Sequence, residues 1–289
     1  MGAFDPPSAN ETLEEARARN VRDALLEDVG TGDLTARLVP QRPVTARVRV
    51  REDAVLCGRD WFDACVLALD EAARIDWLYD EGADMAADTP VCEVRGDARA
   101  MLTAERPALN FLQLLSGTAT AARRHVRAIE GASPNVGGCA ILDTRKTIPG
   151  LRQAQKYAVR VGGGRNQRLA LWDGILIKEN HIAAAGGVGA ALELASQLGA
   201  GVGIQVEVES LDQLREALAA GATSVLLDNF TLERMREAVE LTGGRALLEV
   251  SGGVTLDRLR EIAATGVDRV SVGALTKDVR AVDYSMRIV

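Results

Sequence analysis

The second half of the chain alternates short apolar runs with segments of helical periodicity, and this repeat limits the possible folds more than any other feature. The apolar runs cover residues 139–142, 174–177, 204–208, 224–227, 246–250 and 269–272. The helical segments cover residues 151–160, 187–198, 210–219, 231–242 and 255–264. Short buried strands that alternate with helices are typical of a parallel sheet covered by helices. We therefore predict an α/β barrel, with a doubly wound open sheet as the structural alternative.

A polar or small residue lies at or just after the end of each later strand. These residues are Lys178, Glu207, Asp228, Ser251 and Gly273, which are separated by 29, 21, 23 and 22 residues. Because the carboxyl ends of barrel strands meet at one rim, the side chains should converge on one cavity. Glu207 and Asp228 could there hold Mg²⁺ or stabilise a cationic transition state. The alternative is a buried ion pair with Lys178 or Arg145.

The segment from 143 to 181 is positively charged in an otherwise acidic protein. It contains eight lysines and arginines against three acidic residues, whereas the whole chain has a formal net charge of −7. Arg145 and Lys146 follow the first apolar run, and Lys178 follows the second. Cations at these strand ends predict a pocket for a small polyanion. Lys156 and Arg160 lie one helical turn apart, and for these two we predict a surface helix with solvated charges.

The last two strand–helix turns contain glycine and other small residues. They read Ser251-Gly252-Gly253 and Gly273-Ala274-Leu275. Small side chains leave backbone N–H groups accessible ahead of a following helix, which is a common arrangement for binding phosphate. Barrels frequently bind phosphate after their last two strands, so we predict a phosphate site at these turns.

The first third of the chain predicts a separate α+β unit. Thr12 and Glu15 form a capping-box pattern at the start of a helix. A long helix is expected over residues 102–131, with Thr103 as its N-cap. Arg106 would then stand at the start of this helix, where the helix dipole disfavours a cation. This arginine should therefore pair with a carboxylate or serve a ligand.

Composition excludes several other classes of function. Aromatic residues make up 3% of the chain and the net charge is −7, which disfavours binding to nucleic acid. No apolar run reaches the length of a membrane span, and residues 1–20 lack the apolar core of a signal peptide. The four cysteines show no C-x-x-C spacing, which is typical of free thiols in a reducing compartment. We therefore expect a cytoplasmic protein with no membrane interaction.

Ordered motifs run along nearly the whole chain. They are Asp-Thr-Arg-Lys-Thr-Ile-Pro-Gly-Leu-Arg (143–152), Gly-Gly-Gly-Arg-Asn-Gln-Arg (162–168), Ile-Lys-Glu-Asn-His (177–181), Val-Glu-Val-Glu (206–209), Leu-Asp-Asn (227–229), Ser-Gly-Gly (251–253) and Ser-Val-Gly-Ala-Leu-Thr (271–276). Together they resemble the quinolinate phosphoribosyltransferase family. The resemblance implies an N-terminal α+β sandwich domain over residues 1–116 and an incomplete, seven-stranded α/β barrel over 117–276. It also implies that the C-terminal tail, 277–289, packs back on the first domain.

The same resemblance implies an activity, a cofactor and a partner. Members of this family transfer a phosphoribosyl group from phosphoribosyl pyrophosphate to quinolinate with Mg²⁺. The products are nicotinate mononucleotide for NAD synthesis, pyrophosphate and carbon dioxide. The resemblance further implies a homodimer in which Arg106 reaches the active site of the partner subunit.

Site residues follow from the resemblance position by position. The implied substrate-binding residues are Arg106, Thr144, Arg145, Lys146, Gln167, Arg168 and Lys178. The implied catalytic residues are Lys178, Glu207 and Asp228. Of these, Glu207 and Asp228 would also serve the Mg²⁺ ion. The implied phosphate-binding residues are Ser251, Gly252, Gly253, Gly273, Ala274 and Leu275.

One residue departs from the family pattern, which reads Asn-His-Arg where this chain has Asn166-Gln167-Arg168. Glutamine can donate an amide N–H to a carboxylate, but it carries no charge and moves no proton. We therefore interpret Gln167 as a binding residue. Two alternatives stay open: an aldolase that forms a Schiff base on Lys178, and a non-catalytic relative of the molybdenum-transport type that binds an anion.

Overall fold

The computed structural model describes residues 9–289, and the chain divides into two compact units. The first unit contains the residues up to Ala119 together with Ile148–Ala158 and Arg280–Val289. The second unit contains Thr120–Thr147 and Val159–Val279. Residues 1–8, which the sequence analysis assigned to the N-terminal domain, lie outside the described residues.

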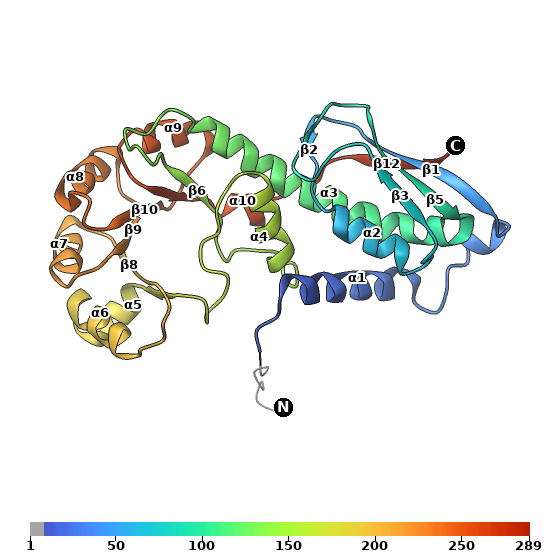
Figure 1. The fold of residues 1–289 in the computed structure, drawn as a ribbon. Helices are drawn as coiled ribbons and strands as arrows, with labels where there is room; N and C mark the ends of the chain where they lie inside the picture. Colours follow the sequence, from blue (N-terminus) through green and yellow to red (C-terminus); the bar gives the residue numbers. More distant parts are fainter. Residues whose placement is uncertain (1–8) are drawn as a thin grey trace. The chain divides into compact units, whose positions relative to one another are not determined.

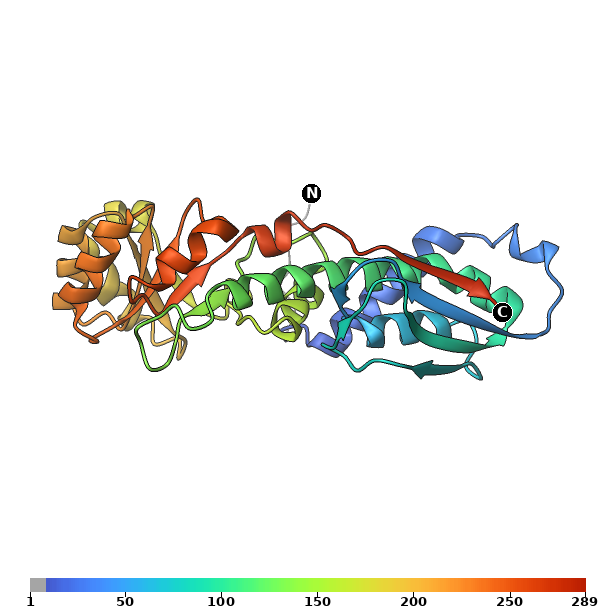
Figure 2. The same cartoon turned by 90° about the horizontal axis from the view of Figure 1, so that it is seen from above.

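The first unit is built on a four-stranded antiparallel sheet. Its strands, in spatial order, are β12 (Tyr284–Ile288), β1 (Pro43–Val50), β5 (Pro90–Asp97) and β3 (Arg74–Trp77). Figure 2 shows the red C-terminal strand beside the blue β1. Ala46, Val48 and Val50 are fully buried while the arginines between them are partly exposed, as expected of a strand with one face on a core.

Short elements and helices complete the first unit. They are α1 (Leu13–Val29), η1 (Ala36–Leu38), α2 (Arg59–Leu67) and a two-stranded sheet of β2 (Ala54–Val55) and β4 (Asp84–Met85). The predicted capping box at α1 is confirmed. The Glu15 carboxylate accepts the Thr12 N–H at 2.8 Å, and the Thr12 hydroxyl accepts the Glu15 N–H at 3.2 Å. Two backbone donors at the helix start are thereby satisfied.

The long helix α3 (Ala98–Ala128) begins earlier than predicted, and the prediction that Thr103 caps it is wrong. Asp97, the last residue of β5, is in the capping position: its Oδ1 accepts N–H groups of Arg99 at 3.0 Å and Ala100 at 3.1 Å. The strand thus passes into the helix without a loop that the sequence could signal. Arg106 consequently lies in the third turn and is exposed, so the helix-dipole argument for it does not apply.

Helix α4 (Arg152–Val161) corrects a second prediction. Arg160 is exposed as expected, but Lys156 is 1% exposed, so its prediction as a solvated surface charge is wrong. The neighbouring Tyr157 packs its ring 5.4 Å from that of Trp61 and donates its hydroxyl to Glu81 at 3.0 Å. This part of α4 is therefore covered by other segments of the first unit. Sequence spacing reveals which residues share a helix face but not which face is covered.

The second unit is built on a parallel sheet of six strands. In spatial order they are β6 (Ala140–Leu142), β11 (Arg269–Ser271), β10 (Leu247–Ser251), β9 (Ser224–Asp228), β8 (Ile204–Val208) and β7 (Ile175–Ile177). The predicted strand positions are confirmed to within one or two residues. The helices of this unit are α5 (Glu179–Ala185), α6 (Val188–Gln197), α7 (Leu211–Ala219), α8 (Leu232–Thr242), η2 (Leu256–Arg258), α9 (Leu259–Ala263) and α10 (Ala274–Lys277).

The sheet curves with helices on its outer side, where Figure 1 shows α6, α7, α8 and α9 in sequence around the strands. This parallel sheet contains six paired strands among residues 9–289, so the seven-stranded count is not confirmed. Beside the edge strand β6, Arg165 forms a single parallel bridge to Leu142. The Arg165 N–H donates to the Ile141 carbonyl at 2.8 Å, and the Arg165 carbonyl accepts the Asp143 N–H at 3.2 Å.

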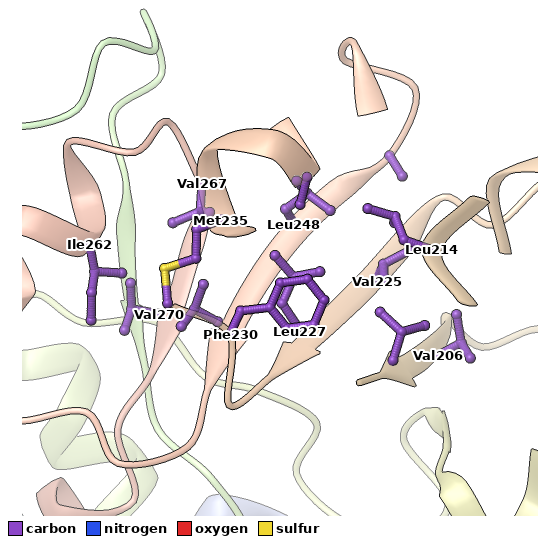
Figure 3. Close-up of a cluster of buried hydrophobic side chains, with 14 of the residues drawn as sticks. Val206, Leu214, Val225, Leu227, Phe230, Met235, Leu248, Ile262, Val267 and Val270 are labelled. Atoms are coloured by element: carbon purple, nitrogen blue, oxygen red, sulfur yellow. The ribbon is translucent and has the colours of Figure 1, made fainter. Parts of the chain in front are cut away.

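The core of the second unit lies between the strands and the outer helices. Figure 3 shows strand residues such as Val225, Leu227 and Leu248 near helix residues such as Leu214 and Met235. All of these side chains are at most 3% exposed. Each buried side chain of this size contributes about 1.5–3 kcal/mol relative to exposure. This packing holds the strand ends as a fixed platform for polar side chains.

No helix within residues 9–289 is both long and apolar enough to cross a membrane. All four cysteines are free thiols, and Cys57, Cys65 and Cys92 are buried. Burial raises the pKa of the Cys65 thiol to about 12, so this group remains protonated and unreactive at neutral pH.

Candidate active site

A cavity of about 750 Å³ lies at the carboxyl end of the parallel sheet in the second unit. Most of the predicted site residues line it: Thr144, Arg145, Lys146, Gln167, Arg168, Lys178, Glu207, Asp228, Ser251, Gly252, Gly253, Gly273 and Ala274. Two do not. Leu275 is 1% exposed and belongs to the hydrophobic core, and Arg106 belongs to the first unit. The volume is within the usual range for sites that hold small molecules.

The acidic side chains reach the cavity through the geometry of the strands. Val206 and Val208 of β8 are fully buried, and Glu207 between them faces the opposite side. Asp228, the last residue of β9, pairs in register with Ser251, the last residue of β10. Parallel neighbours therefore present their polar side chains at the same edge of the sheet.

Lys178 directly follows β7, and its ammonium lies 3.1 Å from Oε2 and 3.3 Å from Oε1 of Glu207 on the paired strand β8. The Glu207 side chain is 12% exposed and that of Lys178 is 45% exposed. Burial raises the pKa of Glu207 above its ordinary value, and the bond to Lys178 opposes this rise. The ion pair that the sequence left open is thus present, with a partly exposed ammonium that lines the cavity.

Arg145 and Arg168 form the cationic part of the lining. Nη1 of Arg168 donates to the Gly174 carbonyl at 3.0 Å, which fixes the guanidinium. Nε of Arg168 is buried and has no hydrogen-bond partner within residues 9–289. Burial, followed by the positive charge of Arg145, lowers the pKa of Arg168, which still stays charged. Two guanidiniums close enough to repel are typical of a site whose anionic ligand supplies the missing charge.

The turn after β10 depends on glycine. Gly252 has φ of +95°, and a Cβ on it would lie 2.2 Å from Oδ1 of Asn229. Asn229 itself has φ of 55° and donates its side-chain N–H to Asp228 at 2.8 Å. The glycine therefore permits a close approach between the turn after β9 and the turn after β10.

Sequence reasoning missed two residues of the cavity floor, Glu249 and Ser271. They are 1% and 5% exposed, and the Ser271 hydroxyl donates to Oε1 of Glu249. Gln205 of β8 donates its amide N–H to Oε2 of the same carboxylate at 2.9 Å. The available signal was an acid and an amide inside runs that are otherwise apolar, because a buried polar side chain requires a partner.

Among the carboxylates that line the cavity, Glu207 and Asp228 are the two predicted to serve a metal ion, whereas both oxygens of Glu249 accept hydrogen bonds from Gln205 and Ser271. No group of three or more histidine, cysteine or acidic side chains able to hold a metal occurs among residues 9–289. A cation here would therefore take part of its coordination from a ligand or from water. Mg²⁺ commonly binds through one or two carboxylates together with substrate phosphates.

Protein-family models match nearly the whole chain. The model of the N-terminal domain of quinolinate phosphoribosyl transferase matches residues 33–116, and the model of its C-terminal domain matches residues 118–287. The chain belongs to the quinolinate phosphoribosyltransferase family. A relative from Mycobacterium leprae, named nicotinate-nucleotide pyrophosphorylase [carboxylating], is 41% identical over 283 residues, covering 94% of this chain and 97% of its own. A probable enzyme of the same name from Bacillus subtilis is 40% identical over 265 residues, covering 91% of this chain and 90% of its own.

Solved structures of this family share the whole fold. The nicotinate-nucleotide pyrophosphorylase from Francisella tularensis has a TM-score of 0.92 and 43% identity, covering 99% of this chain and 100% of its own. A structure from Streptococcus pyogenes has a TM-score of 0.90 and 35% identity, covering 97% of this chain and 98% of its own. Both the N-terminal and the barrel-like units of this family member are therefore represented in its relatives.

Proposed function

We propose that this chain transfers the phosphoribosyl group of phosphoribosyl pyrophosphate to quinolinate, with loss of carbon dioxide, to give nicotinate mononucleotide and pyrophosphate for NAD synthesis. The observation that carries this proposal is one cavity lined by Arg145, Lys146, Arg168 and Lys178 together with Glu207 and Asp228. Quinolinate is a dianion, and phosphoribosyl pyrophosphate is a polyanion whose reacting carbon becomes positive. The cavity supplies the opposite charge for each.

Arg145 and Arg168 bind the two quinolinate carboxylates in this proposal, with Lys146 and the Gln167 amide beside them. A guanidinium matches a carboxylate through two parallel N–H groups and also fixes the plane of the pyridine ring. The buried Nε of Arg168, which lacks a hydrogen-bond partner within residues 9–289, supports this role. Binding fixes the ring nitrogen in one direction, so that its lone pair faces the sugar.

Glu207 and Asp228 act on the ribose side. As the bond between the anomeric carbon and pyrophosphate breaks, positive charge develops on the sugar and negative charge on the leaving group. Fixed carboxylates stabilise the first charge, while Lys178 and the turns at 251–253 and 273–274 bind the phosphates. The ring nitrogen then forms the new bond to the anomeric carbon and becomes a pyridinium.

Carbon dioxide leaves from the ring carbon next to that nitrogen. The bond to the carboxylate carbon breaks, its electron pair stays on the ring carbon beside the positive nitrogen, and a proton then replaces the lost group. For these steps the chain has to hold quinolinate with its ring nitrogen directed at the sugar. The sequence of steps needs no covalent enzyme intermediate. The Lys178 side-chain nitrogen lies 3.1 Å from Glu207, and a lysine held in an ion pair is poorly placed to attack a carbonyl, which argues against a Schiff base on this lysine.

Mg²⁺ fits the carboxylates that line the cavity, since hard oxygen donors suit this ion and substrate phosphates complete its shell. Glu207 and Asp228 would hold it, directly or through water. When bound, it would neutralise charge on the departing pyrophosphate.

We further propose a homodimer in which Arg106 serves the active site of the partner subunit. Exposure of this arginine in the third turn of α3 supports the proposal. The test mixes two inactive variants, Arg106→Ala and Lys178→Ala, under conditions that exchange subunits. A heterodimer would then hold one intact site, so random mixing should restore about a quarter of the wild-type activity. A mixture that stays inactive would show that Arg106 acts within its own subunit or not at all.

We also propose that the Arg165 bridge acts as a seventh strand of one residue that extends the sheet beyond β6. The cytoplasm is the proposed compartment, supported by the four free cysteines.

The direct experiment incubates purified protein with quinolinate, phosphoribosyl pyrophosphate and Mg²⁺, and follows nicotinate mononucleotide by chromatography. Product that depends on all three components supports the proposal. Tight quinolinate binding with no product would instead indicate the non-catalytic relative.

A further inference from the structure

A file of hydrogen-bonded side chains crosses the floor of the cavity. Nε2 of Gln167 donates to Oε1 of Gln205 at 3.0 Å, and Nε2 of Gln205 donates to Oε2 of Glu249 at 2.9 Å. The Ser271 hydroxyl donates to the other oxygen of Glu249. Gln205, Glu249 and Ser271 come from β8, β10 and β11, so three strands of the sheet fix the file.

The buried end of this file determines its direction. Both oxygens of Glu249 act as acceptors, one for the Ser271 hydroxyl and one for Gln205, so Glu249 takes the N–H end of the Gln205 amide. The carbonyl end of Gln205 must then face Gln167, which can only donate to it. Gln205 is 8% exposed and Glu249 is 1% exposed, so water does not readily substitute for either partner.

The main chain of Gln167 is fixed separately. Its N–H donates to Oδ1 of Asp143 at 3.0 Å, and Asp143 is fully buried. Gln167 is thus held at its backbone by one carboxylate and at its side chain by the file that ends at Glu249. The next residue, Arg168, lines the same cavity.

We propose that Gln205 and Glu249 are positioning residues that set the amide of Gln167 for a carboxylate of quinolinate. The proposal rests on the proposed function and extends it to residues that need not touch the substrate. The Gln167 amide nitrogen carries two N–H groups, of which one points to Gln205. The other donates to the substrate carboxylate once the amide is held in this orientation. A flipped amide would present its carbonyl oxygen and repel the same carboxylate.

This arrangement gives residue 167 a recognition role without a titratable group. A neutral amide has two orientations of similar shape, so it discriminates only if its surroundings select one. The accepting carboxylate at the buried end of the file makes that selection. Quinolinate binding should therefore depend on Glu249 even though the proposal assigns this residue no contact with the substrate.

The test compares Gln167→Ala, Gln205→Met and the double variant, with Gln197→Met as the matched control. Gln197 is an exposed glutamine of α6 in the same unit. Gln167→Ala should raise the KM for quinolinate by roughly ten- to a hundredfold, the usual effect of one hydrogen bond to a charged group, and Gln205→Met should raise it by up to the same factor. The KM for phosphoribosyl pyrophosphate and the melting temperature should change little. The KM of the double variant for quinolinate should be no higher than that of Gln167→Ala, because Gln205 acts through Gln167.

Glu249→Gln provides a second variant for the case in which Gln205→Met does not fold. It conserves shape but replaces one accepting oxygen with an NH₂ donor, so the Gln205 amide is no longer held in one orientation. The KM for quinolinate should rise severalfold at unchanged KM for phosphoribosyl pyrophosphate. An unchanged KM for quinolinate in Glu249→Gln would overturn the positioning role. So would a double variant of Gln167 and Gln205 whose KM rises by the product of the two single effects, because Gln205 would then act independently of Gln167, as a packing residue only.

The dissociation constant of quinolinate, measured by calorimetry, separates this inference from the proposed function. Wild-type turnover establishes the function, and the variants then test the file. If the wild-type protein binds quinolinate without turnover, the proposed function fails and the same variants still test the file through the dissociation constant. If it binds none, both are overturned.

Discussion

The ammonium of Lys178 lies 3.1 Å from a carboxylate oxygen of Glu207 on the adjacent parallel strand. In the cavity lining, Arg145, Lys146 and Lys178 follow the edge strands β6 and β7, whereas Glu207, Asp228 and Glu249 lie on β8, β9 and β10. The ion pair therefore links the basic part of the lining to the acidic part. Each partner has a separate role in the proposed reaction. Lys178 binds the anionic substrates, and Glu207 faces the sugar that becomes positive.

Removal of a cation from this cavity should abolish turnover without unfolding the chain. Lys178→Ala and Arg145→Ala are each expected to lower kcat/KM by about 10²-fold or more, since charge in a closed site is stabilised strongly by fixed partners. Arg215→Ala, which removes an exposed arginine of α7, is the control and should retain full activity. Steady-state kinetics with circular dichroism would check both. Near wild-type rates in either cavity variant would refute the assignment of these residues.

Glu207 should take up a proton at a higher pH than an ordinary glutamate, because burial raises its pKa. In Lys178→Met the opposing ion pair is lost, so the pKa should rise further. NMR titration of labelled glutamate carboxyls would measure both values, with the Glu207 signal assigned from its absence in Glu207→Gln. A pKa at or below the ordinary value in the wild-type protein would contradict the burial of this carboxylate.

The two glycines of the turn after β10 should tolerate alanine differently. Both have positive φ, but a Cβ at Gly252 would lie 2.2 Å from Oδ1 of Asn229, whereas a Cβ at Gly253 would meet nothing within 4 Å. Gly253→Ala should cost about 1 kcal/mol of stability from the left-handed backbone alone. Gly252→Ala should cost more and should also raise the KM for phosphoribosyl pyrophosphate, because Asn229 must move. Equal unfolding free energies in urea would argue against the close approach of these turns.

Asp63 of α2 should make the stability of the protein dependent on pH. Burial raises its pKa from 3.8 to about 6, although the Trp77 indole N–H donates to it at 3.0 Å. Folding therefore favours the protonated carboxyl of Asp63. The resulting gain in the free energy of unfolding is complete below pH 3.8 and is lost as the pH rises through about 6. Asp63→Asn keeps an acceptor for Trp77 and removes the charge.

The stabilisation by Asp63→Asn at pH 8 should be on the order of 1 kcal/mol, or about 2–4 °C in Tm. The gain should disappear below pH 4. Asp80→Asn, at a fully exposed side chain, is the control and should change Tm little at either pH. An Asp63→Asn variant that is less stable at pH 8 than the wild type would contradict the burial argument.

The repeat of the second half was predictable because each strand is short, apolar and followed by polar residues. That pattern located all six strands and most of the cavity lining, including Lys178 and Asp228. It could not locate Glu249, whose partners Gln205 and Ser271 are distant in sequence and meet only in the folded sheet. Identifying a buried network requires knowledge of which strands are neighbours.

Errors in the first half have a similar physical origin. Thr103 is a good capping residue, yet Asp97 caps α3 because the strand leads straight into the helix. Lys156 has the spacing of a surface charge, yet its side chain is 1% exposed. Local sequence describes the propensity of a segment, whereas these outcomes depend on contacts between segments.

The central claim is that paired cations hold a pyridine dicarboxylate while the opposite acids act on the sugar, and substrate choice tests it most directly. In the presence of Mg²⁺, purified protein should convert quinolinate and phosphoribosyl pyrophosphate to nicotinate mononucleotide, pyrophosphate and carbon dioxide in equal amounts. Nicotinate, which lacks the second carboxylate, should react at least about tenfold less efficiently in kcat/KM, because buried cationic groups are left without a partner. Equal efficiency with nicotinate, or product without carbon dioxide from quinolinate, would contradict the account.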